Sequence, residues 1–205
     1  MYEHNFFNTR FIKAQIEKLN IAIVEKPEIS QNIKLYYFGC HDDYIFCEYL
    51  RPTLDKSQPC ERKALMEITR VLINESCDAY NELLITGHYS FEDKSSNNRQ
   101  ILEEKMHNCL NLNFVIYLLV EITHAFSHIE DMGHDIQVSE SGVRDDFIYA
   151  EYFHHQFSDF LPCVRKALMQ IIRVIINATS ECCGKLKTLG YLDYQGFVVI
   201  PDELK

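Results

Sequence analysis

Three Glu-x-x-His pairs are the residues of this sequence whose types and spacing could support chemistry. On a helix, positions i and i+3 share one face, and a carboxylate beside an imidazole is the ligand pair of di-iron helical bundles. The pairs are Glu104 with His107, Glu121 with His124, and Glu151 with His154, and His128 continues the face of the second pair. A metal-dependent helical-bundle enzyme is therefore one hypothesis for the function.

Two features weigh against a metal site. A di-iron centre also needs single carboxylates that project inward from two further helices. In addition, an internal repeat described below places Arg51 at the position equivalent to His154, and its charge would oppose a bound cation. We therefore predict no metal and no cofactor, and we interpret these histidines as surface or hydrogen-bonded residues.

Cysteine chemistry has one candidate setting, which occurs twice. Cys60 and Cys163 each lie just before an Arg-Lys pair at the predicted start of a helix, and such a setting favours a thiolate. The sequence has no Cys-x-x-Cys, no Gly-x-Ser-x-Gly and no glycine-rich phosphate loop. The other six of the eight cysteines have no counterpart in the other half. We predict reduced thiols that pack as small apolar side chains, and no enzymatic activity.

Both cysteines belong to a segment that the chain uses twice. Residues 59–74 and 162–177 are identical at 12 of 16 positions, and the same offset of 103 residues aligns further motifs, such as Glu48-Tyr49 with Glu151-Tyr152, without a gap. This is a tandem duplication of one small unit and not a solenoid array, whose repeats are much shorter. We predict two repeats, residues 1–97 and 98–205, packed as one globular body.

Each repeat is predicted to form three helices. Only seven glycines and five prolines occur in 205 residues, which disfavours a protein with many strands and turns. Amphipathic spacing, capping residues and prolines predict helices over residues 3–25, 44–51 and 59–87, and over 99–129, 146–156 and 162–189. The predicted fold class is all-α, with two three-helix units related by a pseudo-two-fold axis. Residues 191–200 can add a short C-terminal β-hairpin around Gln195-Gly196.

The helix predicted over residues 99–129 is apolar almost all round from Leu112 to Val120. Two explanations stay open: it is the central helix of the fused body, or its extra apolar face is a dimer or partner interface. In either case, aspartate at Leu118 or Leu119 should unfold the protein or dissociate an oligomer. In the helix of residues 3–25, replacement by aspartate should destabilise the protein severely at Ile16 and mildly at Gln15.

The charge of the chain limits its partners. The formal net charge is −10, which repels phosphate backbones, and no lysine-rich or arginine-rich run counters it. The first residues lack the pattern of a secretory signal, and no apolar run approaches the roughly 20 residues of a membrane span. We expect a cytoplasmic protein that binds neither nucleic acid nor membranes.

Repeated carboxylates are the candidate partner-binding residues. They lie at the start of the short helix of each repeat or within it, and are Asp42, Asp43 and Glu48, with their copies Asp145, Asp146 and Glu151. They either cap helices and form ion pairs between helices, or present an acidic surface to a basic partner. The leading hypothesis is an acidic protein-interaction module: an inhibitor, immunity protein or chaperone that neutralises a basic partner such as a nuclease toxin. Homodimerisation stays open.

Overall fold

The computed structural model describes residues 9–24, 54, 57–88, 112–127 and 153–191. The long elements in these ranges are four helices, α1 (Thr9–Val24), α4 (Pro59–Ile85), α6 (Leu112–Ser127) and α8 (Pro162–Thr188). These ranges contain no strand, so the all-α prediction is confirmed for this part of the chain. None of their helices combines the length and apolar character needed to cross a bilayer.

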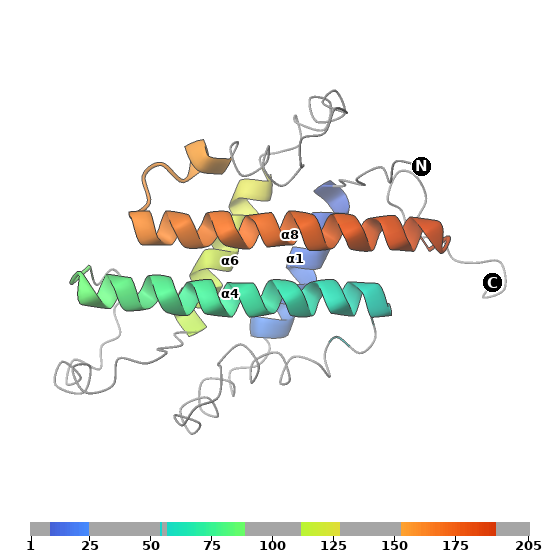
Figure 1. Cartoon of the computed structure of the whole chain (residues 1–205), viewed down its shortest axis with the longest axis horizontal. Helices are drawn as coiled ribbons and strands as arrows, with labels where there is room; N and C mark the ends of the chain where they lie inside the picture. Colours follow the sequence, from blue (N-terminus) through green and yellow to red (C-terminus); the bar gives the residue numbers. More distant parts are fainter. Residues whose placement is uncertain (1–8, 25–53, 55–56, 89–111, 128–152, 192–205) are drawn as a thin grey trace, which may run out of the picture.

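The four helices form two crossed layers (Figure 1). α4 and α8 lie side by side and run in opposite directions, and α1 and α6 cross behind them. The most extensive helix contacts are between α4 and α8, followed by those between α1 and α6. Each helix therefore packs chiefly on a partner from the other half of the sequence.

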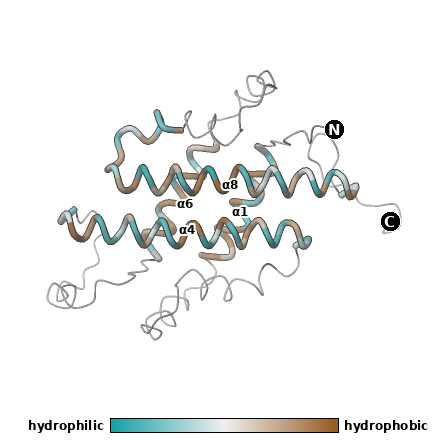
Figure 2. The backbone as a smooth tube through the Cα atoms, in the orientation of Figure 1, coloured by the Kyte–Doolittle hydropathy of each residue, from teal (hydrophilic) through white to brown (hydrophobic). Residues whose placement is uncertain are grey.

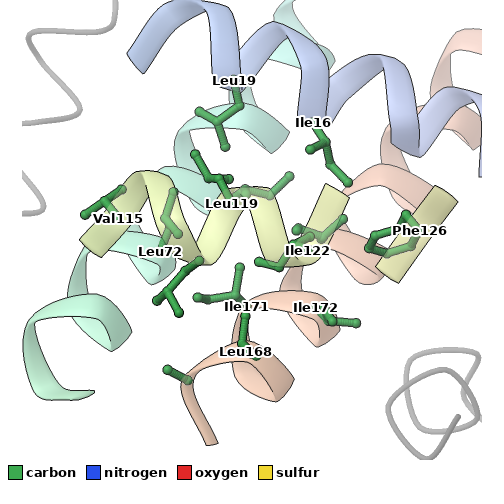
Figure 3. Packing of buried hydrophobic residues seen from close by; sticks show 14 of the residues in the cluster. Ile16, Leu19, Leu72, Val115, Leu119, Ile122, Phe126, Leu168, Ile171 and Ile172 are labelled. Carbon is green, nitrogen blue, oxygen red and sulfur yellow. The ribbon is translucent and has the colours of Figure 1, made fainter. Parts of the chain in front are cut away.

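The hydrophobic core lies between the two layers. Apolar side chains from all four helices meet there, including Ile16 of α1, Leu72 of α4, Leu119 of α6 and Ile171 of α8 (Figure 3). Hydrophobic and hydrophilic residues alternate along α4 and α8 (Figure 2), as expected for helices with one face in the core and one in solvent. Burial of these stripes is the main force that holds the layers together.

Local sequence signals set both ends of α4. Pro59 occupies the first turn, where its missing N–H leaves no hydrogen bond unmade. The backbone N–H of Gln58 donates to Oε2 of Glu61 at 3.0 Å. At the other end Gly87 adopts a φ of 74°, which glycine reaches without steric cost, and the N–H of His88 donates to the carbonyl of Leu83 at 3.0 Å. The predicted end of this helix near Gly87 is confirmed.

The helix bounds follow the sequence repeat. α6 and α8 begin and end 103 residues after α1 and α4, and Gly190, 103 residues after Gly87, also has a positive φ, 78°. The short helix of residues 44–51, the candidate hairpin and much of the helix of residues 146–156 lie outside the described residues. The superposition of complete three-helix units therefore stays a prediction.

α6 packs in the core in the same way as α1. Both helices contact each of the other three long helices, and Leu118 and Leu119 of α6 are buried, as the apolar run predicted. One side of the helix nevertheless remains open, because Val120 is 42% exposed. The packing therefore does not distinguish a central helix from one whose exposed side is an interface, and both explanations stay predictions.

Gln15 corrects one expectation. Its side chain was expected to tolerate aspartate, but it is only 1% exposed. Gln15 lies four residues from both Phe11 and Leu19, so helical geometry places all three on the buried stripe of α1. Its Nε2 donates to Oε1 of Glu61 at 3.1 Å, which satisfies part of the amide inside the protein. The residue type suggested exposure, but the position on the helix determines burial.

Candidate protein-interaction surface

The predicted acidic residues remain untested by the structure. Asp42, Asp43, Glu48, Asp145, Asp146 and Glu151 all lie outside the described residues. Whether they cap helices or face a partner stays a prediction. Several charged residues in the described part of the chain lie along the line where α4 and α8 meet. We name this line the α4–α8 seam.

The histidine pairs do not assemble into a ligand cluster in the described ranges. Glu121 is half-buried on α6 and His124 is exposed beside it, while His154 is exposed in the short helical segment of residues 153–156. Glu104, His107, His128 and Glu151 lie outside these ranges. Among the residues that the structure does describe, no group of three or more His, Cys, Asp or Glu side chains is placed to hold a metal ion.

One end of the seam carries balanced charge. A small groove opens there, lined by Cys60, Lys63, Ala64 and Glu67 of α4 and by Ala178, Glu181, Cys182 and Lys185 of α8. Glu181 forms ion pairs with Lys185 on its own helix and with Lys63 across the seam, the latter at 3.4 Å between Nζ and Oε1. The hydrogen bond from Lys185 is the main reason that the pKa of Glu181 is low. Such exposed pairs add little stability, but they neutralise this end.

The opposite end of the seam is acidic. Because α4 and α8 run in opposite directions, the carboxylates Glu75, Asp78 and Glu82 of α4 lie at the end where α8 begins, and Lys166 is the α8 residue whose charge acts on Glu75. We name these four residues the acidic end of the seam. Burial and then the charge of Asp78 raise the pKa of Glu75, although Lys166 acts in the other direction. Lys166 therefore offsets part of the negative charge around Glu75.

The two ends are equivalent in the repeat but differ in charge. At an offset of 103 residues, Glu75 corresponds to Ala178, Asp78 to Glu181 and Glu82 to Lys185. Sequence reasoning missed this acidic end because it looked for residues that both repeats share. The sequence indicates this end through charges that one repeat carries and the other lacks, on a helix face that the two repeats otherwise share.

A second charged group joins the two layers and is structural. Lys18 of α1 donates to Oε1 of Glu61 in α4 at 2.7 Å. Burial favours a higher pKa for Glu61, but the hydrogen bonds from Lys18 and from the Gln58 backbone outweigh it and hold the pKa below its usual value. This ion pair therefore supports the fold at neutral pH, and its contribution fades as acid protonates Glu61.

No family model matches the chain, and the searches of curated proteins and of solved structures found no significant match. The functional argument therefore rests on the residues and their geometry.

The raised pKa of Glu75 gives a test of the acidic end. A carboxyl whose pKa is higher in the folded than in the unfolded state disfavours folding once the pH exceeds its folded pKa. Replacing Glu75 by glutamine should therefore raise the melting temperature at pH 7 by about 1–3 °C. The gain should shrink as the pH falls and Glu75 becomes protonated.

The matched control is Glu67→Gln. Glu67 is exposed in the groove at the balanced end of the seam, beside Lys63, so removing its charge should not stabilise the protein. Thermal unfolding followed by circular dichroism between pH 4 and 8 measures both variants. A lower melting temperature for Glu75→Gln at pH 7 would contradict the electrostatic assignment.

Proposed function

We propose that the chain is an acidic protein-interaction module that binds and neutralises a basic protein partner, as an inhibitor, an immunity protein or a chaperone does. The observation that carries this proposal is the acidic end of the α4–α8 seam. Asp78 and Glu82 are exposed and Glu75 is half-buried beside them, on a helix whose apolar stripe is buried in the core. Together with the net charge of −10, this fixed cluster would attract and orient a basic surface.

The proposed architecture is a homodimer-like pair of three-helix units fused into one cytoplasmic chain, with repeats at residues 1–97 and 98–205. Asn20 supports it, because its Nδ2 donates to Oγ1 of Thr123, the residue 103 positions later, at 3.2 Å. In a two-fold assembly, a residue that contacts its own equivalent lies on the symmetry axis. The common offset of the helix bounds supports the same axis. The cysteines in the described ranges are all thiols, which agrees with a reducing compartment.

The difference in charge between the two ends of the seam predicts which end binds the partner. A homodimer would present the same charge at both ends, whereas this chain has three carboxylates at one end and paired charges at the other. A basic partner would therefore bind the acidic end in preference to its pseudo-symmetric counterpart, and one partner molecule would bind each chain.

The experiment begins by capturing the partner from source cells with tagged full-length protein and then measures association by stopped flow. We expect the on-rate to fall about tenfold or more as salt rises, because the Debye length falls from about 30 Å at 0.01 M to about 10 Å at 0.1 M. The double variant Asp78→Lys, Glu82→Lys should lower the on-rate at low salt without unfolding the protein. The control Glu67→Lys, on the same helix at the balanced end, should have a smaller effect.

The predicted carboxylates outside the described residues are tested in the same assay. Reversal of Asp42 with Asp43, or of Asp145 with Asp146, should lower the on-rate if these residues extend the acidic surface. Binding that does not depend on salt and is unaffected by every reversal would overturn the acidic-module proposal.

A further inference from the structure

We propose that Cys60 and Cys182 form a redox-active dithiol, which a hydroperoxide converts into a disulfide across the α4–α8 seam. This modification site goes beyond the proposed interaction function and does not depend on it. It would join the start of α4 to the last turns of α8, and so fasten the two repeats to each other.

The first support is the placement of the two thiols. Cys60 is the second residue of α4, Cys182 lies near the end of α8, and both line the groove at the balanced end of the seam. Cys60 lies close enough to Cys182 to raise the pKa of its thiol. α4 and α8 make the most extensive contacts of the four helices, so two thiols that line one groove between them are candidates for a disulfide.

The second support is the difference in access. Cys60 is half-buried and borders the open groove, whereas Cys182 is only 2% exposed. The groove also carries the ammonium groups of Lys63 and Lys185. Cys60 is therefore the thiol that a small oxidant meets first. The positive charges of the groove would stabilise the hydroxide or alkoxide that leaves the peroxide when the Cys60 sulfur attacks it. Cys182 is positioned directly behind it.

The chemistry balances with the peroxide as the oxidant. The Cys60 sulfur attacks one peroxide oxygen, the O–O bond breaks, and Cys60 becomes a sulfenic acid while water or an alcohol leaves with the thiol proton. The Cys182 sulfur then attacks the Cys60 sulfur, the S–O bond breaks, and the departing hydroxide takes the Cys182 proton and leaves as water. The two thiols lose two electrons, which the peroxide gains. Burial, and then the neighbouring Cys60, raise the pKa of the Cys182 thiol, which agrees with its acting second.

The internal repeat supplies a control within the same molecule. Cys163 occupies the position equivalent to Cys60, but Ala79 stands at the position equivalent to Cys182. The residue equivalent to Lys185 is Glu82. The pKa of Cys163 is raised mainly by burial and secondly by the negative charge of Glu82. The second copy therefore has the same cysteine at its helix start, but neither the thiol nor the ammonium group opposite it. Within the described ranges, the first copy is therefore the one that has a second thiol opposite this cysteine.

The test uses the full-length chain, fully reduced and then treated with a small excess of hydrogen peroxide. Peptide mapping by mass spectrometry without reduction should find the Cys60–Cys182 cross-link, and Cys163 should stay reduced over the same period. The disulfide closes a loop of more than 100 residues, so the melting temperature should rise by about 10 °C and return to its starting value with dithiothreitol.

Two variants make the test decisive. Cys182→Ala installs the residue found at the equivalent position 79, and in it Cys60 should stop at a sulfenic acid that dimedone traps. Cys163→Ser should form the cross-link as fast as the parent chain. A peroxide-treated parent protein in which Cys60 and Cys182 stay reduced, or in which either one pairs with a different cysteine, would overturn the proposal.

Discussion

Replacing Leu118 by aspartate is expected to leave the protein unfolded at neutral pH. Leu118 is fully buried on α6, at 0% exposure, and α6 contacts all three other helices. A buried carboxylate without a partner costs several kcal/mol, which is comparable with a total stability of about 5–15 kcal/mol. Far-ultraviolet circular dichroism and a thermal melt measure the loss.

The control lies two residues further along the same helix. Val120 is 42% exposed, so Val120→Asp should change the stability by about 0.5 kcal/mol or less. Both variants introduce the same residue, aspartate, into the same helix. Equal losses at Leu118 and Val120 would mean that α6 is not oriented as the structure places it.

The second large effect is expected at Gln15, which occupies in α1 the position that Leu118 occupies in α6. Gln15→Asp would bring a second carboxylate toward Glu61, the residue that Gln15 now contacts at 3.1 Å. It would also remove the Nε2 donor. Both changes act at a site that is 1% exposed, so we expect a loss of several kcal/mol, measured by urea denaturation at pH 7.

Gln15→Leu separates the effect of charge from that of burial. It removes the hydrogen bond to Glu61, but it also removes the buried Oε1 atom, which has no hydrogen-bond partner. These effects oppose each other, so the leucine variant should lie within about 1 kcal/mol of the parent. If Gln15→Asp proved no worse than Gln15→Leu, the proximity of two carboxylates would not be the cause.

The helices of the described part could be predicted because their signals are local. Pro59 and Gly87 mark the ends of α4. The repeat predicts the ends of α8 in the same way. The apolar spacing of Ile12, Ile16 and Leu19 identifies the buried stripe of α1. None of these inferences needs a contact between residues distant in the sequence.

Gln15 shows where local reasoning failed. Its polar side chain suggested a solvent face, although its position between Phe11 and Leu19 placed it on the buried stripe. A better signal was available, because the other repeat has leucine at this position. Equivalent positions of the two repeats have similar surroundings, so leucine at position 118 indicates that position 15 is buried as well.

The acidic end of the seam could not be predicted from either helix alone. Glu75 and Lys166 are far apart in the sequence, and they act on each other only because α4 and α8 run in opposite directions. The sequence predicted the two helices but not their relative direction or register. The same limit applies to Cys60 and Cys182, which line one groove because of that register.

The pairing of each helix with one from the other half has a consequence for synthesis on the ribosome. When α4 leaves the ribosome, the helices that supply its main contacts and those of α1 have not yet been made. The apolar stripes of the first repeat therefore stay uncovered until α6 and α8 have been made, and the described core can close only then. During that interval the nascent first repeat would be a natural substrate for chaperones that bind exposed apolar helices.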